Sequence, residues 1–512
     1  MKKDEIKVGA VLSYITIAFS NVVGIIYTPI MLRMLGQAEY GIYSLVGSII
    51  SYMSIVDLGF GNATIRYIAK YRAVGDKEKE YSVNGMFIII NTILAAIVLF
   101  IGYVLFKNLH IIFGNSLSST EINKVKIMVF ILSFNLAISF PFGVFSSIIT
   151  AHERFIFPKV IGIIRTILNP IVILSVLYLG FKSIGMVIAN TIINILFIWI
   201  NVFYCFRTLK IKVRFKNFDI DILREIMNYS FYIFIAIIVD KIYWSTDQFI
   251  LGIVSGSTAI AIYSIGSQIN MYYMQFSTSI SGMFLPRITS MVVNKANDDE
   301  LTNIFIKVGR IQYIILSLIL SGFILFGREF VYIWAGEGYI QSYYIALILI
   351  TPFTIPLIQN IGLSILQAKN MHKFRSEVYF WIAIGNLIIS VPLTKQLGGI
   401  GSAIGTAIAM IIGNIIIINI YYYKKVNLDI IRFWKEIFRI TIPILFIIVI
   451  GISLNIIFKK FGILNLIIKI LIYSISYSLI MYNFAMNEYE KNILSKPFKN
   501  FIQKIYRRKV IN

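Results

Sequence analysis

Residues 84–106 read NGMFIIINTILAAIVLFIGYVLF, and this stretch decides the class of protein. None of its side chains is charged. A helix that crosses the roughly 30 Å hydrocarbon core of a bilayer needs about 20 mostly apolar residues. The helix also closes every backbone hydrogen bond within itself, which lipid requires. The stretch therefore predicts a membrane-spanning helix.

Stretches of this kind follow one another through the whole 512-residue chain, and only short links separate them. The sequence therefore predicts an all-α membrane protein of about fourteen transmembrane helices, with no soluble domain left over. The expected spans are residues 8–32, 40–62, 84–106, 127–150, 156–180, 183–206, 227–252, 257–285, 306–327, 340–366, 376–395, 400–423, 438–458 and 462–486.

The composition agrees with a bilayer as the solvent. Hydrophobic residues make up 58% of the chain, charged residues 14%, and the mean hydropathy is +0.81. Soluble domains hold about 45–50% apolar and about 25% charged residues. The single cysteine, Cys205, excludes an internal disulfide, and His110, His152 and His372 stand too far apart for metal-ligand spacing. We therefore expect no metal site built from cysteine or histidine. No cofactor and no enzymatic activity are expected either.

The net charge of +23 is spread over short clusters between the apolar runs. This pattern fits loops that face the anionic inner leaflet, and membrane lipids rather than nucleic acid are the expected partner. Lysine and arginine gather in alternate loops, at 70–79, 207–216, 369–375 and 424–435. The positive-inside rule then predicts a cell-membrane protein with both termini in the cytoplasm.

Three short sequence matches relate the two halves of the chain. Residues 39–45 (EYGIYSL) resemble 259–265 (AIAIYSI), and looser matches join 151–155 to 368–374 and 179–185 to 397–401. The matches predict two pseudo-symmetric six-helix lobes around a central cavity, plus two extra C-terminal helices. The expected domains are an N-lobe at 1–215, a C-lobe at 216–425, two further helices at 426–487 and a basic cytoplasmic tail at 488–512.

A few polar groups fall inside expected spans, where an ionised side chain costs a few kcal/mol. Two interpretations stay open. Arg165 and Lys241 could offer positive charge to an anionic head group in a wet cavity, with Asp240 holding a coupling cation. Alternatively, they form ion pairs between helices, such as Arg165 with Asp240. Lys469 poses the same question. The substrate-cavity candidates are Arg165, Lys241, Asp240, Asp247, Asn21 and Asn270.

Two motifs carry a resemblance to a known family. The run LRMLGQAEYGIYS at 32–44, followed by DLGFG at 57–61, resembles the opening of bacterial polysaccharide-biosynthesis membrane proteins. These are Wzx-like oligosaccharide flippases of the multidrug/oligosaccharidyl-lipid/polysaccharide exporter superfamily. Residues 247–252 (DQFILG) look like the matching start of their second lobe, and the resemblance covers roughly 8–425.

The resemblance implies that the protein exports an undecaprenyl-diphosphate-linked oligosaccharide by alternating access, for capsule, O-antigen or another surface polysaccharide. Polysaccharide polymerases and glycosyltransferases would be its partners. Related lipid II flippases bind sodium in the second lobe, and Asp240, Asn386 and Thr406 fall at comparable places. Ser390 stands where those flippases have a second acid, which puts this cation site in doubt. The first helix of the lipid II flippases carries several arginines. In this sequence, the core of the first expected helix offers only Asn21, which argues against lipid II as the substrate.

Two other functions compete with this one. A cation-coupled multidrug exporter of the same architecture would call for an acid-lined cavity, whereas Arg165 and Lys241 are basic. A membrane polysaccharide polymerase or O-acyltransferase would need long external loops or a placed histidine. The external loops are short, and the only expected external histidine, His110, stands alone.

Overall fold

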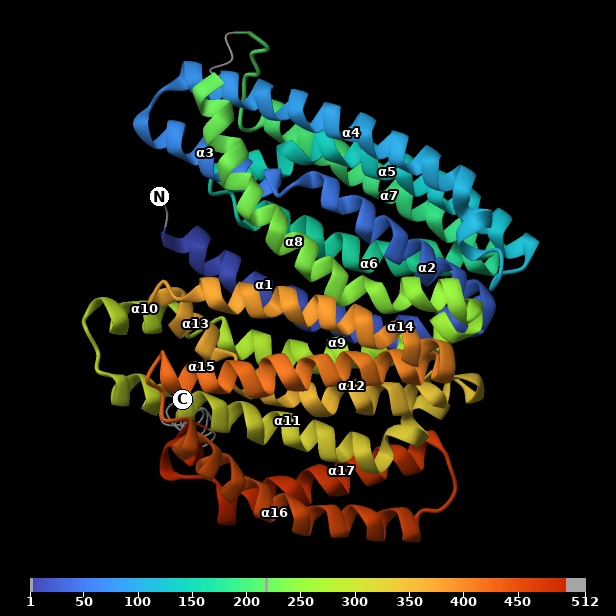
Figure 1. Cartoon of the computed structure of the whole chain (residues 1–512), viewed down its shortest axis with the longest axis vertical. Coiled ribbons are helices and arrows are strands. Elements are labelled where there is room, and N and C mark those ends of the chain that lie inside the picture. Colours follow the sequence, from blue (N-terminus) through green and yellow to red (C-terminus); the bar gives the residue numbers. More distant parts are fainter. Residues whose placement is uncertain (1–2, 217–219, 494–512) are drawn as a thin grey trace, which may run out of the picture. The chain divides into compact units, whose positions relative to one another are not determined.

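The structure is a computed structural model that describes residues 3–216 and 220–493 (Figure 1). Every regular element in this part of the chain is a helix. The described chain divides into two compact units: unit 1 combines Met1–Ile265 with Ala383–Gly405, and unit 2 combines Gly266–Ile382 with Thr406–Asn512. These bounds differ from the predicted domains at 1–215, 216–425 and 426–487, which stay a prediction. Most of the predicted basic tail, 494–512, lies outside the described residues.

Unit 1 is built around the long helix α5, which packs against α3, α4 and α7, while α1 packs against α6 and α2 against α8. Its helices are α1 (Lys3–Leu35), α2 (Gln37–Met53), the 3₁₀ turn η1 (Ser54–Asp57), α3 (Phe60–Val74), α4 (Lys77–Phe113), α5 (Ser119–Ala151), α6 (Ile156–Tyr178), α7 (Lys182–Arg207) and α8 (Ile220–Val254). It also takes the start of α9 (Gly256–Ser281) and the middle of α14 (His372–Met410).

Unit 2 is built around α11, which packs against α12, α16 and α17. Its complete elements are α10 (Leu285–Val293), α11 (Asp298–Trp334), η2 (Glu337–Tyr339), α12 (Gln341–Ile358), α13 (Ile361–Ala368), the π-helix η3 (Ile411–Ile417), α15 (Ile418–Lys424), α16 (Ile430–Ile457), α17 (Ile463–Ile480) and the π-helix η4 (Met481–Ala485).

Twelve helices in the described chain are long and apolar enough to cross a membrane, against about fourteen expected. Two features account for the difference. Helix α9 is absent from the twelve, in keeping with its many hydroxyl and amide side chains. Residues 374–424 form one apolar helical stretch, but Gly398 breaks its geometry with φ 59° and ψ −135°, between the predicted spans 376–395 and 400–423. The all-α, multi-pass membrane class is confirmed.

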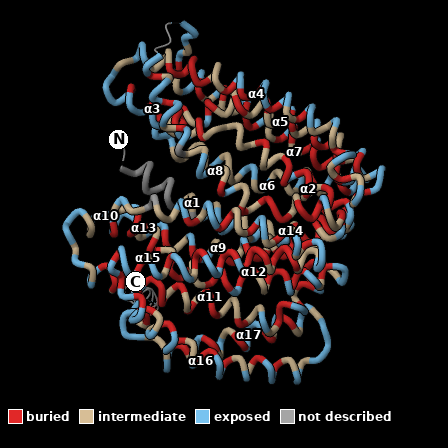
Figure 2. The backbone as a smooth tube through the Cα atoms, in the orientation of Figure 1, coloured by how far each residue is buried: buried red, intermediate tan, exposed pale blue. Residues whose placement is uncertain are grey.

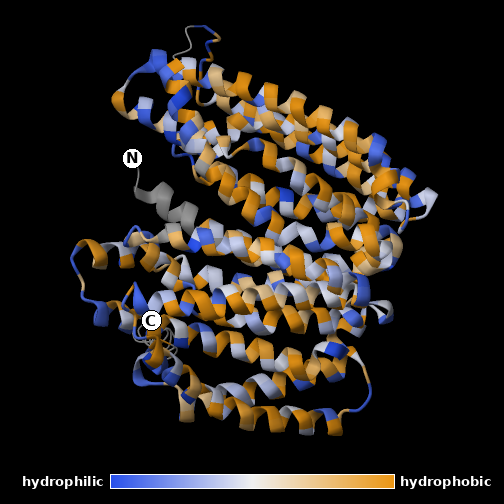
Figure 3. Ribbon diagram, in the orientation of Figure 1, coloured by the Kyte–Doolittle hydropathy of each residue, from blue (hydrophilic) through white to orange (hydrophobic). Residues whose placement is uncertain are grey.

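Many exposed residues of these helices are apolar, as comparison of burial with hydropathy along the chain shows (Figures 2 and 3). On α16, Phe438 and Phe446 are 66% and 68% exposed, while Ile440 and Ile447 on the same helix are fully buried. A helix that is hydrophobic all round is suited to a protein core on one side and lipid on the other. The bilayer therefore takes the place of water around these spans.

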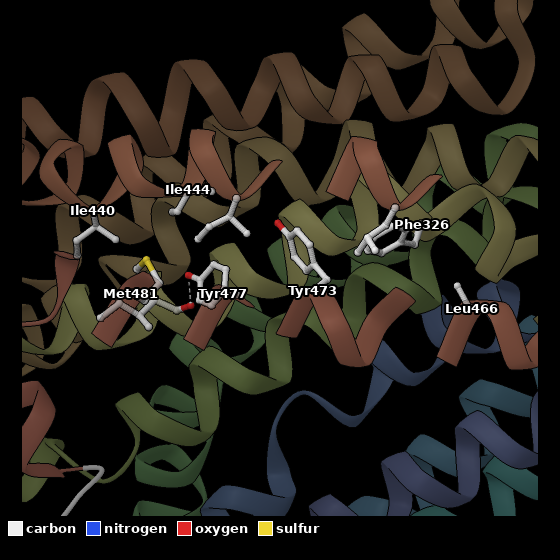
Figure 4. Packing of buried hydrophobic residues seen from close by; sticks show 10 residues of the cluster. Phe326, Ile440, Ile444, Leu466, Tyr473, Tyr477 and Met481 are labelled. Carbon is white, nitrogen blue, oxygen red and sulfur yellow. Dashed lines mark hydrogen bonds between the residues drawn. The ribbon is translucent and has the colours of Figure 1, made fainter. Parts of the chain in front are cut away.

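The last two spanning helices are bound to α11 by apolar packing and by polar contacts (Figure 4). Tyr473 of α17 donates to Ser321 at 2.7 Å, and Tyr477 donates to the carbonyl of Ile314 at 2.8 Å. Lys469 lies 2.7 Å from Glu329, and both side chains are less than 5% exposed. For Lys469, the ion-pair interpretation is therefore the right one.

The family motif at 57–61 ends one helix and begins the next. Leu58 and Gly59 both adopt positive φ, 51° and 75°, and Asp57 accepts hydrogen bonds from the backbone N–H groups of Gly59 and Gly61. The predicted single span at 40–62 is therefore divided into α2, η1 and α3. A Cβ atom at position 59 would lie 2.4 Å from Cγ2 of Ile233 on α8. Only glycine suits both the backbone angle and this contact.

We predict that Gly59→Ala lowers the thermal unfolding temperature of the purified protein, because alanine at positive φ costs about 1 kcal/mol and its methyl group displaces Ile233. Gly47→Ala is the matched control. Its added methyl group meets no atom within 4 Å, and alanine is the better helix former. Equal unfolding temperatures for the two variants would contradict this account of the motif.

Candidate transport site

A buried acid lies at the centre of a polar cluster in unit 1. Asp247 of α8 is 4% exposed, and its two carboxylate oxygens accept hydrogen bonds from the hydroxyls of Tyr263 and Ser402, the latter at 2.7 Å. Charge-assisted bonds of this kind are among the strong hydrogen bonds in proteins. They hold the carboxylate in one position within the helical bundle.

The cluster continues into α14. Ser390 donates to Oδ1 of Asn386 at 2.6 Å and also lies 3.4 Å from the carbonyl oxygen of Ser402. Asn386, Ser390 and Ser402 are each at most 1% exposed. Oxygen atoms from a carboxylate, an amide, a carbonyl and hydroxyls therefore gather at one place, and such atoms are the ligands that hard cations prefer.

Glycines bring the two arms of α14 close enough to build this cluster. After the break at Gly398, the second arm runs back against the first. A Cβ atom at Gly405 would lie 2.3 Å from Oγ of Ser390, and one at Gly401 would lie 2.0 Å from the carbonyl oxygen of Leu393. The absence of side chains at these two positions is what lets Ser402 lie beside Ser390.

The predicted cation residues fall differently in the structure. Asn386 belongs to the cluster, and Thr406 is buried, one turn after Ser402 on α14. Asp240 is exposed and is two helical turns before Asp247 on α8. The acid that joins the cluster is Asp247, which the sequence analysis assigned to the substrate cavity. Its position at the start of the DQFILG motif was the signal that could have pointed to it.

Arg165 of α6 leads a second polar network in unit 1. Its Nη2 donates to Oδ1 of Asn194 at 3.1 Å, and its guanidinium lies 5.8 Å from the ring centre of Phe197. The amide nitrogen of Asn194 in turn donates to Asn135 at 2.8 Å and to Ser139 at 2.9 Å. An exposed arginine of α6 is thus linked through Asn194 of α7 to an amide and a hydroxyl of α5.

In the described part of the chain, Arg165 has no carboxylate within ion-pair distance and Asp240 has no cation, so the ion pair between them that was one alternative is not formed in this structure. Lys241 is half-buried on α8, next to Asp240. Asn21 is half-buried on α1, and its neighbour Ser20 lies 3.3 Å from Thr166, the residue after Arg165. Asn270 is 1% exposed and belongs to unit 2. Whether these groups line one cavity stays a prediction.

Sequence reasoning missed a third polar site in unit 1. Glu39 of the family motif is 8% exposed, forms an ion pair with Lys124 and accepts a hydrogen bond from Ser183. Nearby in the same unit, Ser257 donates to Glu121 at 2.6 Å, and Gly41 leaves space for the Ser257 carbonyl. These contacts tie α2, α5, α7 and the start of α9 together at one end of the unit.

Comparison with known families now places the chain. A family model described as "Polysaccharide biosynthesis protein" matches residues 8–292, more than half of the sequence. The chain belongs to the polysaccharide biosynthesis protein family. A curated relative from Shigella flexneri, described as "Putative O-antigen transporter", is 21% identical over 387 residues, which cover 74% of this chain and 89% of the relative.

Two solved structures share the fold of this chain. The lipid II flippase MurJ in its inward closed conformation matches with a TM-score of 0.71 and 16% identity, over 95% of this chain and 99% of the flippase. An inward-facing multidrug resistance transporter of the MATE family, in the MOP superfamily, matches with a TM-score of 0.64 and 14% identity, over 78% and 92% of the two chains. At these identities the similarity shows the fold alone.

The exposure of the Arg165 network to water can be tested chemically. Cys205 is fully buried, so a Cys205→Ala background is suitable for adding single cysteines. We expect Arg165→Cys to react with a charged methanethiosulfonate reagent at least about tenfold faster than Phe446→Cys, because reaction requires a thiolate and hence water. Both native side chains are exposed, but Phe446 lies on an apolar surface. Equal, slow reaction of both cysteines would mean that Arg165 faces lipid.

Proposed function

We propose that the protein is a flippase that moves an undecaprenyl-diphosphate-linked oligosaccharide across the cytoplasmic membrane for surface polysaccharide. It works by alternating access, with both termini in the cytoplasm, and supplies the polysaccharide polymerase and related assembly proteins. Family membership and the transporter fold support this class of function. The observation that carries the proposal is Arg165, a cation within a spanning helix that donates a hydrogen bond to the Asn194 amide and that no described carboxylate neutralises.

The chemistry of the substrate fits this network. A guanidinium within a membrane span needs a countercharge or water, and a diphosphate supplies two negatively charged groups that arginine binds well. Asn194, Asn135 and Ser139 then present donors and acceptors of the kind that sugar hydroxyls use. The apolar outer surface of the helices leaves the polyprenyl chain in lipid throughout the cycle.

The named relatives agree with a lipid-linked substrate. One is described as an O-antigen transporter and another as a lipid II flippase. Here the first helix carries no arginine between residues 8 and 32, so we propose an oligosaccharide other than lipid II as the cargo.

We further propose that cation binding at the Asp247 cluster drives the cycle. Asp247, Asn386 and Ser402 offer the oxygen atoms that a sodium ion needs, and Ser390 contributes a hydroxyl in place of a second acid. One carboxylate leaves the occupied site neutral, which suits a buried position.

A cation-coupled drug exporter is the competing function, because the fold is shared with multidrug transporters and Asp247 is a buried acid. Arg165 and Lys241 count against cationic drugs, which positive charge repels. Drug sensitivity of a deletion strain with intact surface polysaccharide would favour the exporter.

We predict that Arg165→Gln reduces surface polysaccharide at least about tenfold in a deletion strain complemented with the variant, since one charge-assisted contact contributes about 1.5–3 kcal/mol. Lipid-linked repeat units should then accumulate in the membrane. Arg207→Gln is the matched control, because Arg207 also lies over a phenylalanine ring, 5.3 Å from Phe203, but at the end of α7. Normal polysaccharide with Arg165→Gln, at equal protein level, would overturn the proposal.

For the cation site, we expect sodium chloride, compared with choline chloride, to raise the unfolding temperature of the purified wild-type protein and of Asp240→Asn. The increase reflects binding to the folded state only. Asp247→Asn should abolish it, because the variant loses the carboxylate of the cluster. A sodium effect that survives in Asp247→Asn but disappears in Asp240→Asn would restore the assignment made from the sequence.

A further inference from the structure

A second site for an anion lies in unit 2. A pocket of about 570 Å³ opens between α10, the first turns of α11 and the segment that follows η4. Arg287 and Ser290 of α10, Lys307 of α11 and Tyr489 are among its lining residues. This volume is within the range of small-molecule binding sites. None of these residues belongs to the candidate transport site.

The residues that line the pocket carry a net positive charge. Arg287 and Lys307 outnumber Glu300, the one acid among the described lining residues, whose carboxylate accepts the backbone N–H of Asn297 at 3.1 Å. Just outside the lining, Asp298 lies 2.8 Å from Lys369 and Asp299 lies 3.1 Å from Arg432. In the described part of the chain, neither Arg287 nor Lys307 has a carboxylate within ion-pair distance. The two cations therefore remain available to a ligand.

A buried ion-pair network fixes the far wall of the pocket. Arg310 of α11 lies 2.7 Å from Glu490 and 2.9 Å from Glu436 of α16, and Arg310 and Glu490 are at most 5% exposed. Glu490 thereby holds the adjacent Tyr489, whose ring centre lies 5.3 Å from Nζ of Lys307. The wall is thus part of the folded unit rather than a loose end of the chain.

If the midpoint of α11 is taken as the bilayer centre, the pocket falls at the edge of the hydrocarbon core, next to the lipid head groups. Helix α11 extends from Asp298 to Trp334, so Lys307 is nine residues, or about 14 Å, from its midpoint at Leu316. Half the thickness of the hydrocarbon core is about 15 Å. Beside the pocket, Leu285 and Val293 at the two ends of α10 are 38% and 73% exposed, as expected for a short amphipathic helix at the interface.

We propose that this pocket binds the phosphate of an anionic phospholipid, with Arg287 and Lys307 contacting the phosphate. Ser290 and Tyr489 contact the polar part of the head group, while the acyl chains lie in the bilayer beside α10. The apolar flank and the membrane depth favour a lipid over a soluble phosphate compound.

Native mass spectrometry of the purified full-length protein tests the proposal, with phosphatidylglycerol and phosphatidylcholine as probes. The wild type should retain phosphatidylglycerol in preference to phosphatidylcholine. The double variant Arg287→Gln/Lys307→Gln should retain it roughly tenfold less, since each cation near the membrane surface contributes about 1 kcal/mol. Lys435→Gln is the control, because Lys435 is also exposed in unit 2 but does not line the pocket.

Equal retention by the double variant and the control would overturn the proposal, as would equal retention of the two lipids. Inorganic phosphate provides the third arm. Calorimetry measures whether inorganic phosphate binds the wild type at micromolar concentration and whether the double variant loses this binding. If it does, and the double variant still retains as much phosphatidylglycerol as the wild type, the ligand is a soluble phosphate compound. Monodisperse size-exclusion profiles show that the variants are folded. The outcome is independent of transport, because neither substitution touches Arg165 or Asp247.

Discussion

The fold depends on one constraint: an ionised side chain within the bilayer must find a partner. Lys469 has Glu329 at 2.7 Å, Glu39 has Lys124, and Arg310 has two glutamates. Removing one partner from a buried pair costs about 3–5 kcal/mol, because the other charge stays behind. These pairs therefore hold helices together that are far apart in sequence. Arg165 differs, since its guanidinium donates to the Asn194 amide, which leaves its charge unneutralised.

The same constraint explains how the Asp247 cluster is built. A carboxylate among apolar helices needs donors, and two hydroxyls supply them. One of these hydroxyls is available only because α14 breaks at Gly398 and its arms meet at Gly401 and Gly405. Backbone geometry thus makes possible an arrangement of oxygen atoms that a cation can use. The glycines belong to the site although they bear no side chain.

The sequence predicted what depends on local pattern and missed what depends on long-range contact. Apolar runs such as 84–106 identify spanning helices because each run meets the length requirement by itself. The pairing of Lys469 with Glu329 could not be predicted, because 140 residues separate them. The resemblance to the lipid II flippases led to Asp240 rather than Asp247 for the cation, because the contacts of Asp247 are not visible in the sequence. The hydroxyl donors come from Tyr263 and from Ser402 of α14.

Transport of the lipid-linked cargo is the central claim, and reconstitution tests it most directly. Purified protein is placed in vesicles that carry an undecaprenyl-diphosphate-linked oligosaccharide, and an added glycan-binding probe reads the outer leaflet. Our account predicts that the oligosaccharide of the inner leaflet becomes accessible at a rate that increases with the amount of protein. Accessibility that stays at the protein-free level, with folded protein in the vesicles and a sodium gradient in either direction, would contradict it.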